Sequence, residues 1–366
     1  MSETPANLVD VTGLSGGQAV LADCLIRPLG IVHGPIAEIV VENGIGEWLA
    51  GGPAAYTSVD MATSPAIGGE RELRTIRQVS LMRAPAVVAR MRLLADPRPP
   101  IAGLTWVRPR IMSFVNLVSA RGEAGERSTK GAVQRGRLLA MRGADILAIT
   151  ASDADLGDME EVDRVAPVIE QLAEQGFRVA IASRRPMVMR AAARAGARLV
   201  IDASPALDDD TLYTLGDIGL PVILRRSGHI GAHPASWPEA LDLAAAVHTA
   251  LESRIEMLEG AGLARDRVIV DPGMAVGHPT DENIALLHAV SLFHGLGCPL
   301  MVDCESFVPA RTQTSRAGWV RPGPIEVALS AVSQGVHLLA ANEPADIWSA
   351  AASFRAISAA SFDDAR

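Results

Sequence analysis

The sequence predicts a (β/α)8 barrel preceded by an amino-terminal α+β extension. From about residue 110 onward, short apolar runs alternate with helical patterns eight times over about 250 residues, which is the arrangement of a closed parallel barrel. The apolar runs are mostly rich in valine and isoleucine and most are followed by a polar residue, a pattern typical of buried parallel strands. A doubly wound open sheet is the alternative, but its usual glycine fingerprint after the first strand is missing.

The composition excludes several classes of protein. A length of 366 residues suffices for one large domain and an appendage. The net charge of −9 argues against nucleic acid as a partner, because phosphate backbones bind to basic faces. No apolar run reaches the roughly 18 residues of a membrane helix, and the amino terminus lacks a signal-peptide pattern. The cysteines (Cys24, Cys298 and Cys304) have no metal-type spacing, so a reducing, cytoplasmic location is expected.

Residues 1–107 form the expected extension, to which the sequence assigns no fold. Strands are expected at 20–26, 36–41 and 101–107, and one or two helices between 73 and 94. The Gly51-Gly52-Pro53 segment marks a turn. Residues 108–366 are expected to form the barrel.

Each barrel element has its own sequence signal. In the second expected helix, Val162, Val165, Ile169 and Leu172 recur at helical spacing, with Gly176 as a stop. Asp158 is its expected N-cap, and a proline suits the first turn of the next helix. The expected strands cover residues 111–116, 145–150, 178–182, 198–201, 221–224, 268–271, 300–302 and 336–340. Helices are expected near 128–142, 158–176, after 186, near 208–215, through 244–258, and at 281–294, 324–333 and after 344.

Polar residues at the strand ends are the candidate ligand-binding residues, because the carboxyl ends of barrel strands converge on one mouth. Asp271 ends the Val268-Ile269-Val270 run and precedes Pro272-Gly273. Its carboxylate could accept hydrogen bonds from an N–H-rich ring or bind a metal; the alternative is that it caps its own turn. The substrate-binding candidates are Asn116, Ser183, Arg184, Asp202, Arg225, Arg226, Asp271, Gly277 and Asn342.

A basic loop follows the fifth strand. Arg225, Arg226, His229 and His233 could clamp a phosphate or carboxylate, which arginine binds through a bidentate fork; the alternative is a solvated surface loop. Arg184 precedes a helix N-terminus, itself an anion-binding feature. The other histidines show no metal-binding spacing, and no catalytic residue can be assigned.

The chain from Ile111 to its end resembles dihydropteroate synthase and the wider pterin-binding barrel family. Residues 260–273 and 283–287, with Gly277, are similar to a family segment that contains the Asp-Pro-Gly turn. Residues 111–116 and 194–202 resemble two further family motifs. The resemblance covers about 250 residues and implies a pterin ligand, with Asp271 binding its N–H face.

The chain departs from the family at several positions. The pterin-binding aspartate after the third strand aligns with Ala182, the asparagine after the fourth with Ile201, and the lysine after the seventh with Glu305. The closing arginine and histidine are absent from 340–344. A diphosphate leaving group needs positive charge, so the family's usual condensation is poorly supported.

Three hypotheses follow. The first is a divergent pterin-binding transferase of folate- or methanopterin-type one-carbon metabolism, with Arg184, Arg225 and Arg226 handling anions. The second is an inactive barrel that acts as a binding or assembly subunit. The third is a metal-dependent barrel enzyme in which carboxylates bind a hard ion such as Mg²⁺. Its carboxylates are Asp202, Asp271, Asp303 and Glu343.

A homo-oligomer, for example a dimer, or a subunit of a one-carbon assembly is expected.

Overall fold

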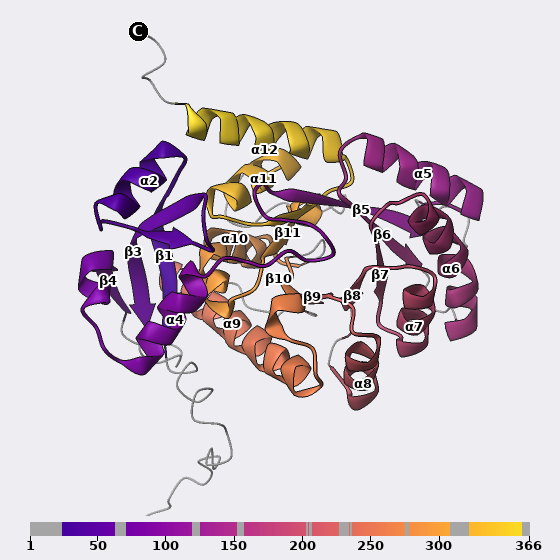
Figure 1. Ribbon diagram of the computed structural model, residues 1–366, viewed down its shortest axis with the longest axis horizontal. Coiled ribbons are helices and arrows are strands. Elements are labelled where there is room, and N and C mark those ends of the chain that lie inside the picture. Colours follow the sequence, from indigo (N-terminus) through magenta and orange to yellow (C-terminus); the bar gives the residue numbers. More distant parts are fainter. Residues whose placement is uncertain are drawn as a thin grey trace, which may run out of the picture.

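The computed structural model contains two sheets, an eight-stranded parallel barrel and a smaller antiparallel sheet beside it (Figure 1). The structure describes residues 24–62, 71–118, 125–151, 157–202, 204, 207–226, 234, 236–274, 278–307 and 322–360.

The parallel sheet confirms the predicted barrel. Its strands pair in the order β10-β9-β8-β7-β6-β5-β12-β11. A single parallel bridge, Val270 with Leu300, joins the two ends of this order and closes the ring. Successive strands in the chain are therefore neighbours in space, as in other (β/α)8 barrels. The strands are β5 (Arg110–Leu117), β6 (Ile146–Ala151), β7 (Val179–Ser183), β8 (Leu199–Asp202), β9 (Val222–Arg225), β10 (Val268–Asp271), β11 (Met301–Asp303) and β12 (Leu338–Ala340).

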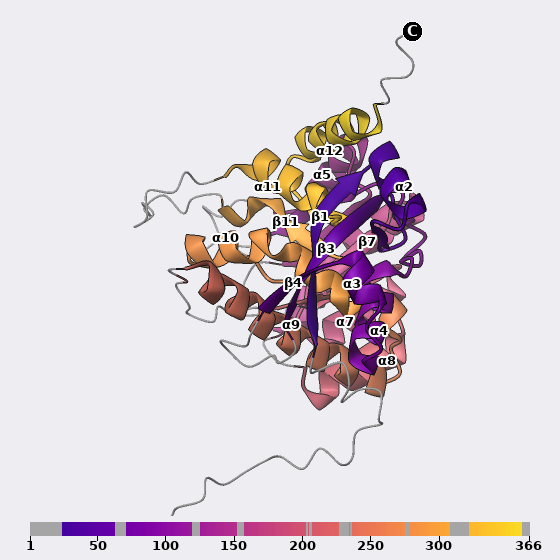
Figure 2. The ribbon, with the colours of Figure 1, turned by 90° about the vertical axis from the view of Figure 1, so that its left-hand side faces the viewer.

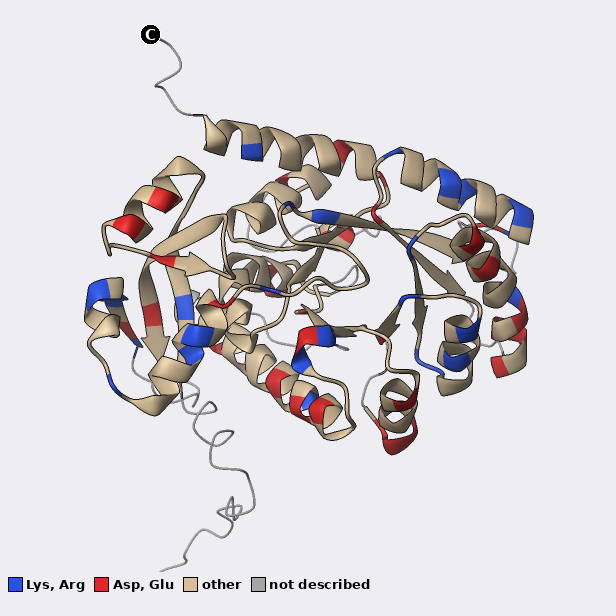
Figure 3. Ribbon diagram, in the orientation of Figure 1, with Lys and Arg blue, Asp and Glu red and all other residues tan. Residues whose placement is uncertain are grey.

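Helices follow the strands and cover the outside of the barrel. Ser128 and Asp208 cap two of them by accepting hydrogen bonds from the backbone N–H groups of Gly131 and Thr211. Acidic residues gather in the first turns of α6 and α8 (Figure 3), where the helix dipole favours them. The helices are α5 (Thr129–Met141), α6 (Asp158–Glu174), α7 (Pro186–Arg194), α8 (Asp209–Ile218), α9 (Trp237–Gly260), α10 (Thr280–His288), α11 (Pro324–Ser333) and α12 (Pro344–Ala359), with the short 3-10 helices η1 (Arg265–Arg267), η2 (Val290–Leu296) and η3 (Cys304–Phe307).

Side chains along each strand point alternately to the two faces of the sheet, so the core of the barrel consists of one cluster inside the barrel and one outside it. Ile223, Ile269 and Met301 belong to the cluster inside the barrel, whereas Val222, Val268 and other residues of opposite parity pack against the helices. Ile101 and Leu104 join the inner cluster from the segment that precedes β5. The strand expected at 101–107 is wrong: this segment is a turn, in which Ala102 and Gly103 have positive φ.

The extension is built on the antiparallel pairing of β1 (Leu25–His33) with β3 (Ala54–Ala62). The short strands β2 (Glu47–Leu49) and β4 (Arg71–Thr75) also pair with β3, and α3 (Ile76–Ser80) and α4 (Pro85–Ala95) follow β4. The strand predicted at 36–41 is wrong, because these residues form the helix α2 (Pro35–Glu42). Proline at its first turn favours the helix.

The extension lies against the barrel (Figure 2), and buried polar contacts join the two. Arg90 of α4 is fully buried and contacts both carboxylate oxygens of Glu252 of α9, each at 3.0 Å. It also donates to the carbonyl of Gly295 in η2 at 2.7 Å. Arg98 donates to the carbonyl of His294 at 3.0 Å. The extension therefore packs on the barrel through charged groups as well as apolar ones.

Candidate active site at the barrel mouth

Three charged side chains converge where β9, β10 and β11 end. Arg225, Asp271 and Asp303 each lie two residues beyond a residue of the inner cluster, so the alternation of the strands directs all three inward. The corresponding residues of β7 and β8 are Ala182 and Ile201, which are apolar. Among the described strand ends, the charged part of the mouth is therefore formed on the side of β9 to β11.

Asp271 is a fully buried carboxylate with one hydrogen bond among the described residues. Its Oδ1 accepts from the backbone N–H of Gly273 at 2.8 Å. Its Oδ2 lies 3.1 Å from Nε of Arg225, yet within the described chain it accepts no hydrogen bond, because the N–H of Arg225 is not aimed at it. Burial raises the pKa of Asp271, and the charge of Arg225 opposes this rise.

Arg225 lies between the two acidic residues. Its Nη2 contacts the carbonyl of Met274 at 3.2 Å and Oδ2 of Asp303 at 3.4 Å. The charge of Asp271 raises the pKa of Arg225, so the guanidinium stays protonated. Burial raises the pKa of Asp303, which accepts from the N–H of Glu305 at 3.0 Å. Within the described residues, the guanidinium of Arg225 thus lies between two carboxyl groups.

Arg226 supports the turn that follows Asp271 instead of facing the mouth. Its Nε donates to the carbonyl of Pro272 at 2.8 Å, and its Nη2 donates to the carbonyl of Gly273 at 3.2 Å. The same Nη2 pairs with the fully buried Glu282 at 2.7 Å. Arg225 and Arg226, which the sequence analysis treated alike, therefore have different surroundings.

Asp202 faces the helices, although its sequence setting resembles that of Asp271. Its Oδ2 pairs with Nη2 of Arg254 at 2.9 Å, and its Oδ1 accepts from the N–H of Ser204 at 3.0 Å. Burial raises the pKa of Asp202. Arg254 also donates to the backbone carbonyl of Arg225 at 2.8 Å. Asp202 therefore contributes indirectly, through Arg254, to the position of β9.

Ser183 and Arg184 also differ in orientation. Ser183 is the register partner of Asp202 and likewise faces outward, where its hydroxyl donates to Glu161 at 2.8 Å. Arg184 is exposed at the end of β7, so it remains accessible at this end of the barrel.

The remaining candidates lie at the rim or outside the described chain. Asn116 is partly buried near the end of β5, beside Thr150 of β6. Asn342 is exposed beyond β12, and its backbone N–H donates to Oε1 of Glu305 at 3.0 Å. Gly277, His229 and His233 lie outside the described residues.

Comparison with known proteins identifies the family. Residues 117–340, more than half of the chain, match the family described as pterin binding enzyme. The chain belongs to this family. The dihydropteroate synthase of Escherichia coli is 27% identical over 249 residues, which cover 64% of this chain and 86% of that protein.

Solved structures support the same assignment to a pterin-binding barrel. Dihydropteroate synthase of Xanthomonas albilineans, solved with 4-aminobenzoic acid, has a TM-score of 0.60 and 29% identity, and the match covers 73% of this chain and 100% of that one. The same enzyme with 7,8-dihydropteroate has a TM-score of 0.59 and 30% identity, with 70% of this chain and 97% of that one covered.

Other relatives are larger. A probable bifunctional folylpolyglutamate synthase/dihydropteroate synthase of Halobacterium salinarum is 29% identical over 213 residues, which cover 56% of this chain. The chain spans 26% of that protein and 21% of its Haloferax volcanii counterpart. No helix in the described ranges is long and apolar enough to cross a membrane.

The four-carboxylate metal site is not present in this pterin-binding barrel. Asp202 faces Arg254, and Glu343 pairs with Arg142 at 2.7 Å outside the mouth. Only Asp271 and Asp303 are brought together, with Arg225 beside both. Within the residues that the structure describes, no group of three or more His, Cys, Asp or Glu could bind a metal. The prediction of this site is wrong because strand parity separates the carboxylates.

Two supporting residues, Arg254 and Glu282, were not predicted from the sequence. Arg254 lies on the same face of α9 as the buried Leu251, Ile255 and Leu258, and a charged residue on an apolar helix face is the signal of a buried ion pair. Glu282 is fully buried in the first turn of α10, and its sequence position suggested only a helix start.

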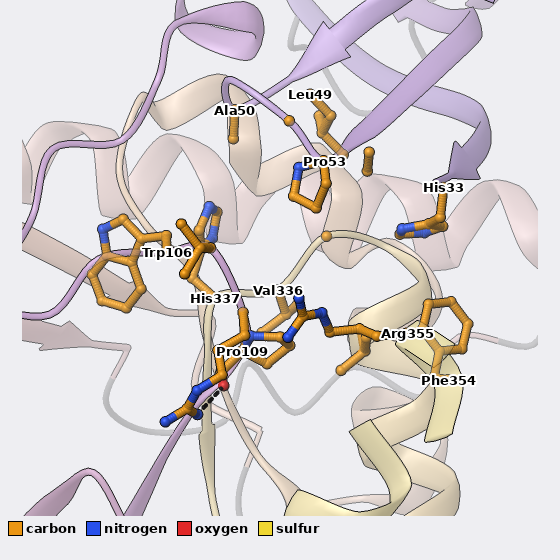
Figure 4. A pocket seen from close by; sticks show the side chains of 16 residues that line it. His33, Leu49, Ala50, Pro53, Trp106, Pro109, Val336, His337, Phe354 and Arg355 are labelled. Carbon is orange, nitrogen blue, oxygen red and sulfur yellow. Dashed lines mark hydrogen bonds between the residues drawn. The ribbon is translucent and has the colours of Figure 1, made fainter. Parts of the chain in front are cut away.

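A hollow between the extension and the barrel lies away from these charged groups (Figure 4). Trp106, Pro109 and His337 line it close to the starts of β5 and β12, at the end of the barrel opposite the mouth. Its volume is about 60 Å³, enough for a few water molecules. Chemistry in (β/α)8 enzymes takes place at the other end, so we place the candidate site at Asp271.

Proposed function

We propose that this protein binds a pterin at the barrel mouth, with the carboxylate of Asp271 accepting N–H groups of the ring. The observation that carries this proposal is the buried Oδ2 of Asp271, which accepts no hydrogen bond within the described chain although Nε of Arg225 lies 3.1 Å away. A buried acceptor without a donor is costly, and an N–H-rich ring edge would satisfy it. The family assignment supports a pterin as the source of that edge.

The proposed reaction is a dihydropteroate synthase-like transfer. An amine would displace diphosphate from a dihydropterin diphosphate, forming a C–N bond as the C–O bond breaks. Arg184 is exposed at the mouth end of β7 and could attract the anionic leaving group. Glu305 near β12 adds negative charge where the family has a lysine, so the second substrate is expected to differ. An amine of the methanopterin branch of one-carbon metabolism is our candidate.

A binding or assembly role is the second candidate. Ala182 and Ile201 are apolar at inward positions, where the family carries an aspartate and an asparagine. A barrel with these replacements could retain the ring through Asp271 without catalysing transfer. Homo-oligomer formation, membership of a one-carbon assembly and a cytoplasmic location stay predictions.

Titration calorimetry with dihydropterin diphosphate, with and without magnesium, tests the proposal. We expect Asp271→Asn to weaken binding at least about tenfold, because charged hydrogen bonds contribute on the order of 1.5–3 kcal/mol. Asp266→Asn changes an exposed carboxylate shortly before β10 and should bind like the wild type.

The outcomes separate the two candidates. Diphosphate release on addition of an aminobenzoate-type nucleophile would support the transferase. Binding without release from any amine tested would favour the binding subunit. A wild-type protein that binds no pterin with or without magnesium would refute both.

A further inference from the structure

The pairing of Arg225 with Asp271 places a donor and an acceptor side by side at the mouth. The two residues are register partners in the β9–β10 pair. Both side chains point inward, and Nε of Arg225 lies 3.1 Å from Oδ2 of Asp271. A ligand that reaches this carboxylate oxygen therefore also meets the guanidinium.

Both groups retain hydrogen-bonding capacity. A guanidinium has five N–H donors. Nε lies beside Asp271, and Nη2 contacts the carbonyl of Met274 and Oδ2 of Asp303. Among the described residues, no hydrogen bond engages Nη1. The side chain of Arg225 is 24% exposed. The groups left to hydrogen-bond a ligand are thus an acceptor on Asp271 and donors on Arg225.

The guanidinium is held in place. Contacts with Met274 and Asp303 fix its position, and the hydrogen bond from Arg254 to the carbonyl of Arg225 fixes its backbone. Asp271 is fixed by the N–H of Gly273. A ligand would therefore lose little free energy in ordering these side chains.

We infer that Arg225 is a specificity-determining residue which, with Asp271, selects a ring edge in which an N–H lies next to a carbonyl oxygen. The N–H of such a cyclic amide would donate to Asp271, and its carbonyl oxygen would accept from Arg225. This inference rests on the proposed function and deepens it, because it assigns recognition of the pterin carbonyl to Arg225. A neutral 2,4-diaminopteridine presents an amino donor to Arg225 and an unprotonated ring nitrogen to Asp271, which leaves polar groups unpaired at both residues. The effect of Arg225 is therefore measured by its variants and not by the wild-type preference alone.

The alternative is that Arg225 occupies the position on Asp271 that the ligand needs. Removal of Arg225 would then strengthen binding of every pteridine. If Arg225 reads the carbonyl, its removal weakens binding of the 4-oxo ring selectively.

The experiment measures dissociation constants of the full-length protein for 6-hydroxymethylpterin and for the matching 2,4-diaminopteridine, above the pH at which either ring is protonated. We expect the wild type to prefer the 4-oxo ring. Arg225→Met should weaken its binding about tenfold or more, the effect of losing a charged hydrogen bond, and should change binding of the diamino ring by less than about twofold. Arg225→Lys keeps the charge and should retain part of the preference. Arg198→Met removes an exposed arginine just before β8, at the opposite end of the barrel, and should change neither constant.

Several results would overturn the inference. Equal weakening of both ligands by Arg225→Met, tighter binding of both, or a wild type without preference would each exclude carbonyl readout while leaving pterin binding intact. If Arg225→Met does not fold, the Arg225→Lys variant decides the question. A wild type that binds neither ring would instead refute the proposed function, and the inference with it.

Discussion

At the scale of single residues, Gly273 determines whether Asp271 can face the mouth. Gly273 has a φ of +80°, and a Cβ added there would lie 2.5 Å from the carbonyl oxygen of Arg226. Its N–H is also the donor to Asp271. Any larger residue would strain the turn and would also displace the N–H that donates to Asp271.

We predict that Gly273→Ala destabilises the protein by about 2 kcal/mol or more, because alanine at positive φ costs about 1–2 kcal/mol before the backbone clash is added. Gly262 also has positive φ, +92°, but open space around its Cβ position; its alanine variant isolates the conformational cost. Gly260 has open space and no positive φ, so Gly260→Ala should be neutral. Thermal unfolding and pterin titration measure the effects. Equal behaviour of the Gly273 and Gly262 variants in both assays would contradict the prediction.

Strand parity explains which residues of the site could be predicted from the sequence. Asp202 and Asp271 both end apolar runs, and the sequence gives no reason to separate them. The structure shows that Asp202 shares the parity of Val200, which packs against the helices, whereas Asp271 shares that of Ile269 inside the barrel. The pairing of Arg225 with Asp271 depends on the β9–β10 register, which no local pattern encodes.

At the scale of elements, the contact of α4 with α9 joins the extension to the barrel. Arg90 and Glu252 form a two-contact ion pair in which Arg90 is fully buried. Arg265 lies 3.9 Å from the same carboxylate. Loss of Arg90 would therefore leave a buried acid with one distant counterion.

We predict that Arg90→Met lowers the free energy of unfolding by about 3 kcal/mol, because removing one partner of a buried ion pair leaves the other charge unpaired. The double variant Arg90→Met/Glu252→Met should recover part of this loss, because both charges are gone. Arg92→Met changes an exposed arginine of the same helix and serves as the control. Chemical denaturation measures all three variants. A double variant no more stable than Arg90→Met would show that the ion pair is not the cause.

The elements of the barrel were predictable and those of the extension largely were not. Each barrel strand lies within about two residues of its predicted bounds, because buried parallel strands give continuous apolar runs. In the extension, residues 36–41 have the β-branched composition of a strand but form α2. Here Pro35 at the first helical turn favours the helix against the strand propensity of the β-branched residues. The turn at 101–104 looked like a strand because its apolar residues enter the barrel interior.

At the scale of the whole molecule, buried neutral histidines make stability depend on pH. His248 and His294 lie on α9 and η2, where the extension meets the barrel. Burial lowers the pKa of each from 6.5 to about 3, and the charges of Arg90 and Arg98, respectively, contribute. Because the unfolded state binds these protons and the folded state does not, their contribution to stability is present above pH 6.5 and is lost as pH falls toward 3.

We predict that lowering the pH from 7 to 5 costs on the order of 2 kcal/mol for each of these histidines, at 1.36 kcal/mol per pKa unit. Asp202, Asp271 and Asp303 act in the opposite direction, because their pKa values are raised. The measurement therefore compares variants with the wild type at each pH by chemical denaturation. His248→Gln/His294→Gln should make the dependence between pH 7 and 5 less steep. His33, His288 and His337, whose pKa values burial also lowers, should keep the remaining part of it. If the free energy of unfolding of the double variant changed with pH as steeply as that of the wild type, these two histidines would not be a cause of the pH dependence.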